Sequence, residues 1–255
     1  MNKKIMMIII FLICIRNIHA QDAGITNVQD IENSSTQNTE NSNDHGIKIT
    51  NVEIEYFLIS DFNRTINYIG GFSTAGKIEF NNRVTVKEGV YLNYCPENVN
   101  IIKLFTNAAY RILADLPLEI NAAWVYNGLP DYETHSHAIV PIISWNTKYY
   151  GISVGYGARF TSFFGEGSLV EHMMPMGLYV NFINNEKLCV GMSIANYTDF
   201  QIDSFIAFAL AAKVSVRINN RLSIVNELEF RESGADGLTN IVHGVVWKGG
   251  AKLSW

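Results

Sequence analysis

The sequence predicts an all-β fold, an antiparallel up-and-down β-barrel of about twelve strands (range 10–12). Large apolar residues alternate with small or charged residues over most of the chain after about residue 47. The ionisable side chains in these runs avoid the apolar face, and short turns separate the runs. Together these observations favour long paired strands that present one apolar and one polar face.

The N-terminus has the order of a cleavable secretory signal. Lys3 and Lys4 precede an apolar run from Ile5 to Ile15, and a small residue, Ala20, comes just before the polar Gln21. The run is about eleven residues long, whereas a helix needs about 20 to cross a bilayer. We therefore expect residues 1–20 to be a signal peptide that is cleaved near Ala20.

The cysteines point to no other anchor. Cys14 is a poor lipoprotein acceptor because Ile13 stands before it, where such sites carry a small side chain. The two remaining cysteines, Cys95 and Cys189, are far apart and do not form a disulfide framework.

Composition divides the rest of the chain into an arm and one large domain. Residues 21–46 are rich in Asn, Ser, Thr and Gln and poor in large apolar residues, which predicts a disordered periplasmic arm. Residues 47–255 have no linker and are predicted to form a single barrel. The net charge of −5 and the dispersed Lys and Arg residues give no nucleic-acid footprint.

The region from Ile206 to Ile218 illustrates the alternation. Its even positions are apolar, and its odd positions carry alanine, serine, lysine or arginine. The same period of two recurs at 150–160 and 188–194. The predicted strands are 47–60, 66–80, 82–94, 99–113, 117–128, 135–146, 148–164, 173–183, 187–198, 204–218, 221–232 and 240–255.

Two predicted turns, near 115 and near 220, test the strand register. A correct register keeps like faces together, and matching the apolar faces alone also brings opposite charges together on the polar face. The predicted pairs are Val216 with Ile224, Lys213 with Glu227, Ile112 with Leu118, and Arg111 with Glu119.

The distribution of charge indicates that the apolar face meets lipid. A Lys or Arg on the lipid face costs ~2–4 kcal/mol at mid-bilayer, so a membrane barrel keeps such residues inside. Only Glu88 breaks the pattern, and a bulge or a register error there would account for it. The charged residues of the polar face are Lys77, Arg83, Lys87, Lys103, Arg111, Arg159, Lys213, Arg217, Glu227, Glu229, Arg231, Lys248 and Lys252.

Aromatic residues lie near predicted strand ends, as in the interfacial girdles of membrane barrels. They include Phe80, Trp124, Tyr126, Trp145, Tyr150, Phe182, Phe230 and Trp255.

The last eight residues resemble the C-terminal signature of bacterial outer-membrane β-barrel proteins. The signature has a polar residue, a glycine two positions later, and hydrophobic residues at the third-last and last positions. Lys248, Gly250, Leu253 and Trp255 occupy these places. The resemblance implies insertion into outer-membrane lipid after recognition by the barrel-assembly machinery.

With both termini periplasmic, the periplasmic turns are predicted near 81, 115, 147, 185 and 220. The outer connections are expected near 62, 97, 131, 168, 201 and 236, and they tend to be longer. Acidic residues assigned to them are Asp61, Asp131, Glu133, Glu166, Glu171, Asp199, Asp203 and Asp236.

The leading functional hypothesis is a narrow porin-like channel for small hydrophilic solutes. A basic lumen would favour anions, although the registers favour charges that simply pair across strands. Barrels of about twelve strands lie between small filled barrels and open porins, so strand number does not decide whether the lumen is open. Candidates for lining the lumen are Arg83, Lys87, Lys103, Arg111, Glu119, Arg159, Lys213, Arg217, Glu227 and Glu229.

Three alternatives remain: a closed barrel with a structural or surface-contact role, a lipid-modifying enzyme, and a soluble periplasmic β-protein. His135 and His137 share one face of a strand, but no cysteine or further histidine lies nearby in sequence, so we expect them to be solvated near an outer loop. No nucleophile, base and orienting group can be assembled from spacing. The sequence thus predicts no enzyme, cofactor or metal site.

Overall fold

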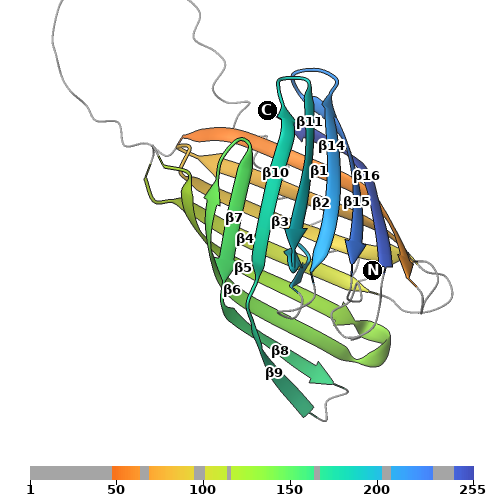
Figure 1. Cartoon of the computed structure of the whole chain (residues 1–255). Coiled ribbons are helices and arrows are strands. Elements are labelled where there is room, and N and C mark those ends of the chain that lie inside the picture. Colours follow the sequence, from red (N-terminus) through yellow and green to blue (C-terminus); the bar gives the residue numbers. More distant parts are fainter. Residues whose placement is uncertain are drawn as a thin grey trace, which may run out of the picture. The chain divides into compact units, whose positions relative to one another are not determined.

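A computed structural model describes residues 48–63, 69–94, 101–113, 116–163, 167–202, 208–231 and 244–255. In the unit Gly46–Trp255 the strands form a closed antiparallel barrel of twelve strands, as the sequence predicts (Figure 1). The predicted signal peptide and arm lie outside the described residues. No helix in the described ranges is long and apolar enough to cross a membrane.

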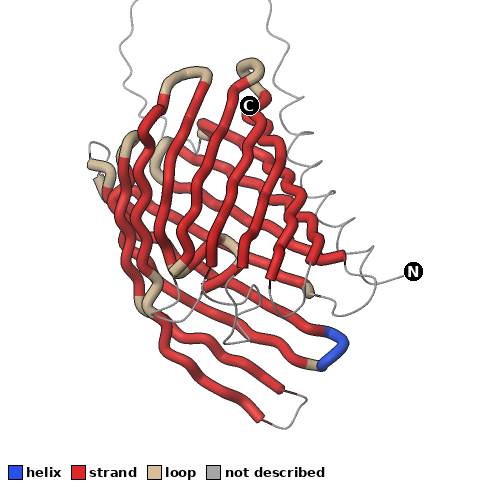
Figure 2. The backbone as a smooth tube through the Cα atoms, turned by 45° about the vertical axis from the view of Figure 1, so that its right-hand side comes forward, coloured by secondary structure: helices blue, strands red, loops and turns tan. Residues whose placement is uncertain are grey.

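The first six strands run up and down in sequence order, each hydrogen-bonded to the next. A single 3-10 turn at Pro130–Tyr132, η1, connects the fifth and sixth and is drawn in blue in Figure 2. The strands are β1 (Ile49–Asn63), β2 (Ile69–Phe80), β3 (Val84–Tyr94), β4 (Ile102–Arg111), β5 (Leu118–Leu129) and β6 (Thr134–Asn146).

The next two barrel strands are each broken into two pieces. Their halves are β7 (Tyr150–Gly155) with β8 (Gly157–Phe163), and β9 (Gly167–Met173) with β10 (Met176–Asn184). The N-terminal half of each strand pairs with the C-terminal half of the other: β7 pairs with β10, and β9 pairs with β8. The β8–β9 hairpin extends beyond the body of the barrel (Figure 1).

The remaining strands complete the ring. They are β11 (Leu188–Ala195), β14 (Ala209–Arg217), β15 (Leu222–Arg231) and β16 (Gly244–Ser254). β16 pairs with β1 from Glu53–Ser254 to Asn63–Gly244, and this seam closes the barrel.

The chain leaves the barrel wall after β11 because the neighbouring strand is interrupted there. Pro175 has no backbone N–H and cannot donate to a ladder. The buried Asn196 compensates: its side-chain oxygen accepts a hydrogen bond from the Met176 N–H (2.6 Å), and its amide donates to the Met174 carbonyl (2.9 Å). These hydrogen bonds satisfy the backbone groups on both sides of Pro175, and beyond Asn196 the chain turns into the barrel.

Beyond Asn196 the chain forms a short hairpin of β12 (Tyr197–Thr198) and β13 (Gln201–Ile202). Gln201 and Ile202 are each only 2 % exposed. We call Asn196–Ile202 the inner hairpin. The expectation of an outer connection near 201 is wrong, because this segment lies inside the barrel and not in solvent.

Other expectations about the strands hold, with local differences. All four predicted pairs are present: Val216 with Ile224, Lys213 with Glu227, Ile112 with Leu118 and Arg111 with Glu119. The connection expected near 168 is displaced, because residues 167–173 form β9. This strand is the first half of the eighth barrel strand, which continues as β10 after Pro175. The bounds of β14, β15 and β16 match those of the predicted strands to within a few residues at each end.

The outward face of the barrel is apolar and exposed, with Leu58, Ile139, Ile152, Tyr156 and Phe182 among its most exposed residues. Glu88 lies on this face too, paired with Gly76 on β2 and Thr106 on β4 in ladders that show no register shift. The bulge or register error suggested for Glu88 is therefore wrong. Glu88 is an exposed carboxylate on the apolar face.

Part of the barrel interior is a packed apolar core. Phe105, Val125, Val140 and Ile142 are almost fully buried, and Ile202 of the inner hairpin packs among them. Phe200 at the hairpin turn packs against this cluster and against a second one that contains Tyr91. The inner hairpin is thus held by burial of large side chains, each worth roughly 1.5–3 kcal/mol when fully buried.

Candidate functional site: a lumen divided by the inner hairpin

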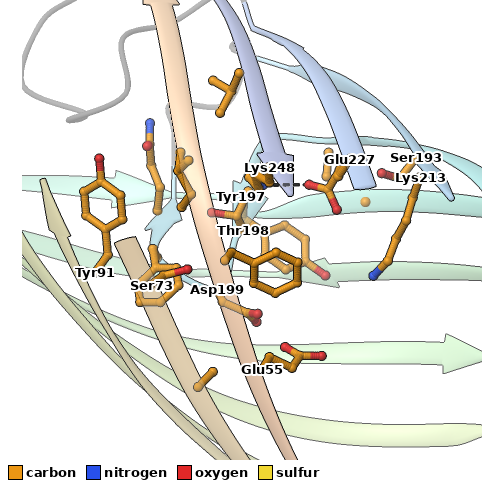
Figure 3. Close-up of a pocket in the computed structure, with 18 of the residues that line it drawn as sticks. Glu55, Ser73, Tyr91, Ser193, Tyr197, Thr198, Asp199, Lys213, Glu227 and Lys248 are labelled. Atoms are coloured by element: carbon orange, nitrogen blue, oxygen red, sulfur yellow. Dashed lines mark hydrogen bonds and ion pairs between the residues drawn. The ribbon is translucent and has the colours of Figure 1, made fainter. Parts of the chain in front are cut away.

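The inner hairpin divides the lumen into a packed side and a side with open space. Phe200 meets the Phe105 ring edge-on at 4.7 Å between centroids and the Tyr91 ring at 6.2 Å. The strands β3 to β6 behind these rings supply the buried core. Beside the hairpin lies a cavity of about 360 Å³, which Figure 3 shows with its polar lining.

Charged and polar side chains of the wall attach the hairpin. The Lys87 ammonium donates to Asp199 Oδ2 at 2.6 Å and lies 3.1 Å from Glu55 Oε2. Gln201 Oε1 accepts hydrogen bonds from Lys103 Nζ (3.2 Å) and Arg231 Nη1 (3.0 Å). Side chains from β3, β4 and β15 therefore hold Asp199 and Gln201 of the inner hairpin.

The opposite side of the hairpin is also tied to the wall. The Tyr197 hydroxyl and the Ser153 hydroxyl share a 2.7 Å hydrogen bond. Burial raises the pKa of Tyr197, so its hydroxyl stays protonated and neutral at physiological pH. Arg159, which is 5 % exposed, donates to the backbone oxygen of Ile202.

The ionisation of Asp199 follows from two opposing effects. Desolvation acts to raise its pKa, but the attraction and hydrogen bond of Lys87 outweigh it, with smaller contributions from Lys248 and Lys213. The pKa of Asp199 consequently lies below its ordinary value. Asp199 was assigned to an outer loop from sequence, and that assignment is wrong because the whole hairpin folds inward.

A second ion cluster lies on β15 and β16. The Lys248 ammonium lies 2.6 Å from Glu227 Oε1 and 2.9 Å from Glu229 Oε2, and Arg231 also pairs with Glu229. Glu229 is only 1 % exposed. The register partner of Glu227 is Lys213, yet the carboxylate of Glu227 bonds to Lys248, so the predicted Lys213–Glu227 ion pair does not form among the described contacts.

The other predicted lining residues lie farther from the cavity. Arg111 and Glu119 form an ion pair of 3.2 Å near the short turns, where Asn146 also donates to Glu119 at 3.0 Å. Arg83 is exposed on the turn between β2 and β3, and Arg217 is exposed at the corresponding end of β14. Glu171, expected in an outer connection, lies on β9 with one oxygen 3.5 Å from Arg159.

Several charged groups inside the barrel were not among the predicted lining residues. Asp61 was assigned to an outer loop but is 5 % exposed on β1, and Glu55 and Arg231 also line the cavity. For the inner hairpin the sequence does carry a signal. Tyr197, Phe200 and Ile202 are large and apolar, which is unusual for a solvated connection. Glu166, Asp203 and Asp236 lie outside the described residues.

His135 and His137 lie on the outward face of β6 among aromatic rings. The His137 ring stacks on Trp124 at 6.0 Å and lies 5.0 Å from the Tyr126 ring, and the two histidine rings are 5.8 Å apart. They were expected to be solvated beside an outer loop. They do lie at the start of β6, next to η1, where His135 is exposed and His137 is half-buried among the rings. Among the described residues no group of three or more His, Cys, Asp or Glu is placed to hold a metal ion.

Three residues of the C-terminal signature, Lys248, Gly250 and Leu253, lie on β16, and Trp255 follows its last residue. Lys248 points into the ion cluster, and Gly250 pairs with Phe57 of β1. The last residue, Trp255, exchanges backbone hydrogen bonds with Val52 at 2.9 and 3.2 Å. The signature thus coincides with the seam that closes the barrel.

No family model matches the chain, and no curated protein sequence matches it. Solved structures are similar to the chain. The NanC porin superposes with a TM-score of 0.54 and 10% sequence identity, over 78% of this chain and 98% of that chain. A KdgM porin in complex with disordered oligogalacturonate superposes with a TM-score of 0.52 and 9% sequence identity, over 80% of this chain and 99% of that chain. An outer membrane channel from Pseudomonas putida F1 gives 0.51 at 6% over 86% and 100%. The chain has the fold of the bacterial outer-membrane β-barrel proteins.

Proposed function

We propose that this protein is a narrow porin-like channel for small hydrophilic solutes in the bacterial outer membrane. The observation that carries the proposal is the cavity of about 360 Å³ inside the barrel, whose lining combines ionisable and hydroxyl side chains with apolar ones such as Phe57 and Val246. A purely structural barrel of this size could fill its interior with apolar side chains. Here only one side of the interior is filled in that way.

The exposure of the inward residues supports a water path along the other side. Lys213 and Arg217 on β14 are exposed although they face inward, whereas Lys103 and Arg159 across the barrel are each 5 % exposed. Water therefore reaches the β14 side of the lumen. Hydrated solutes small enough to pass the inner hairpin would follow the same path.

The structural similarity supports this proposal at the level of the fold. The three similar proteins are porins or a channel, one of them solved with an oligogalacturonate. We further propose that the chain has no enzymatic activity. Outer-membrane lipid around the apolar face, and the barrel-assembly machinery at the C-terminal signature, remain its proposed partners.

Planar-bilayer recording tests the channel. Purified protein should show discrete small conductance steps, and a variant in which a Gly-Ser linker replaces Thr198–Ile202 should show steps several-fold larger, because the hairpin narrows the lumen. Both proteins are first checked for heat-modifiable migration on gels, which reports a closed barrel. No conductance above background from either folded protein would overturn the proposal.

A closed barrel with a surface-contact role is the second candidate. It is favoured by the β8–β9 hairpin, whose Leu169 and Val170 are about half exposed at 47 % and 52 %. Under this alternative the native protein is silent in bilayers and only the hairpin variant conducts. Replacing Leu169 and Val170 by serine would then abolish surface binding and leave the barrel intact.

A further inference from the structure

Charge is distributed unevenly around the lumen. The wall formed by β7, β10, β11 and β14 presents small or uncharged side chains inward, such as Ser153, Tyr179 and Ser193. The only charges on the described inward positions of this wall are Lys213 and Arg217 on β14. No carboxylate lies among those positions.

The carboxylates of the cavity lie on β1, on β15 next to β14, or in the inner hairpin, and three of them are engaged by cations of other elements. Glu227 bonds to Lys248, and Asp199 and Glu55 both bond to Lys87. Figure 3 shows Glu227 joined to Lys248 while the Lys213 ammonium points away into the cavity. The acidic groups nearest to Lys213 thus have their charge compensated by other residues.

Lys213 and Arg217 make no side-chain hydrogen bond or ion pair within the described ranges. Lys213 acts on Asp199 only through a longer-range attraction. The two cations are four residues apart on the same face of β14, which separates them by about 13 Å along the strand. Ser215 lies between them on that face, and both cations are exposed to water.

We propose that Lys213 and Arg217 form a cationic track along the open side of the lumen that selects small anionic solutes over cations. This inference rests on the proposed channel function and names the class of solute that the channel prefers. An unpaired charge in a narrow passage raises the local concentration of ions of opposite sign. The electric fields of two paired opposite charges largely cancel in the passage. The whole lumen need not be basic for this selection to operate.

The reversal potential in a KCl gradient across a planar bilayer measures the preference. Native protein should be more permeable to chloride than to potassium. Lys213→Met and Arg217→Met should each lower the permeability ratio roughly two- to threefold, and the double charge reversal Lys213→Glu with Arg217→Glu should invert it. Lys213→Arg should keep the native ratio, since it conserves the charge.

Lys148→Met is the matched control, because it removes a positive charge from the turn outside the barrel wall. It should leave the ratio unchanged. Replacing chloride by acetate or by phosphate then shows whether carboxylates or phosphates pass more readily.

The outcomes separate this inference from the channel proposal. Native conductance with a ratio that does not respond to Lys213 and Arg217 overturns the cationic track and leaves the channel in place. Absence of conductance in folded native protein overturns both.

Discussion

Single residues on the outward face show how strictly the membrane environment constrains side-chain choice. Glu88 is an exposed carboxylate on a predominantly apolar surface, in a regular ladder beside Gly76 and Thr106. An ionised side chain there loses hydration with no compensating partner among the described residues. The sequence alone identified Glu88 as exceptional, but only the observed register shows that it truly faces outward.

Replacing Glu88 by valine should stabilise the barrel. The expected gain is about 1 kcal/mol in the free energy of unfolding, because carboxylates on the lipid face cost less than Lys or Arg. Urea unfolding in lipid vesicles, followed by tryptophan fluorescence, measures the change, with Val86→Ala on the same face and strand as a destabilising control. A loss of stability in the valine variant would instead reveal a partner for Glu88 outside this chain.

At the scale of elements, the inner hairpin is the feature that departs most from the predicted pattern. Alternation predicted β11 and β14 within a few residues, yet it placed their connection outside the barrel. The reason is that strand periodicity reports only local pleating. The direction in which a connection folds depends on Pro175 and Asn196, which are separated by a whole strand pair.

The attachment of the inner hairpin should depend on pH. The pKa of Asp199 lies below the unfolded value near 3.9 because Lys87 stabilises the ionised form. Ionised Asp199 therefore holds the hairpin above about pH 4, and this stabilisation is lost as pH falls through the lowered pKa. The Asp199 side chain is 44% exposed, so its contribution is only about 1 kcal/mol.

Channel conductance should consequently rise modestly as the pH is lowered from 7 to below the lowered pKa of Asp199, since the hairpin keeps its buried apolar contacts. Asp199→Asn should already show the higher conductance at pH 7 and respond little to acid. The comparison uses single-channel recordings of both proteins across that range. Identical acid responses in native and Asp199→Asn proteins would exclude Asp199 as the titrating group.

At the scale of the whole molecule, barrel closure depends on the seam between β1 and β16. Gly250 approaches β1 so closely that an added Cβ would lie 2.0 Å from the Tyr56 carbonyl oxygen and 2.6 Å from the Phe57 ring. Gly76, on the other side of β1, has open space, with nothing within 4 Å of an added Cβ. Alanine should therefore be costly at Gly250 and nearly neutral at Gly76.

Gly250→Ala should destabilise the closed barrel by roughly 1–3 kcal/mol through overpacking. Gly76→Ala should change stability by no more than about 0.5 kcal/mol. Heat modifiability of protein refolded from urea in detergent compares the two without the assembly machinery. If both variants lose the heat-modifiable band at the same temperature, the seam accommodates the added methyl group with no loss of stability.

The sequence by itself determined the all-β class, the strand number, the face of nearly every side chain and the hairpin registers, because a period of two is written in adjacent residues. It also located the ion pair of Arg111 with Glu119, which follows directly from register. Only the tertiary structure decided what fills the lumen. The attachment of Asp199 to Lys87 and the open side along β14 depend on strands distant in sequence, which meet only when the barrel closes. Glu227 has a lysine opposite it on each neighbouring strand, and register alone does not decide that it bonds to Lys248 and not to Lys213.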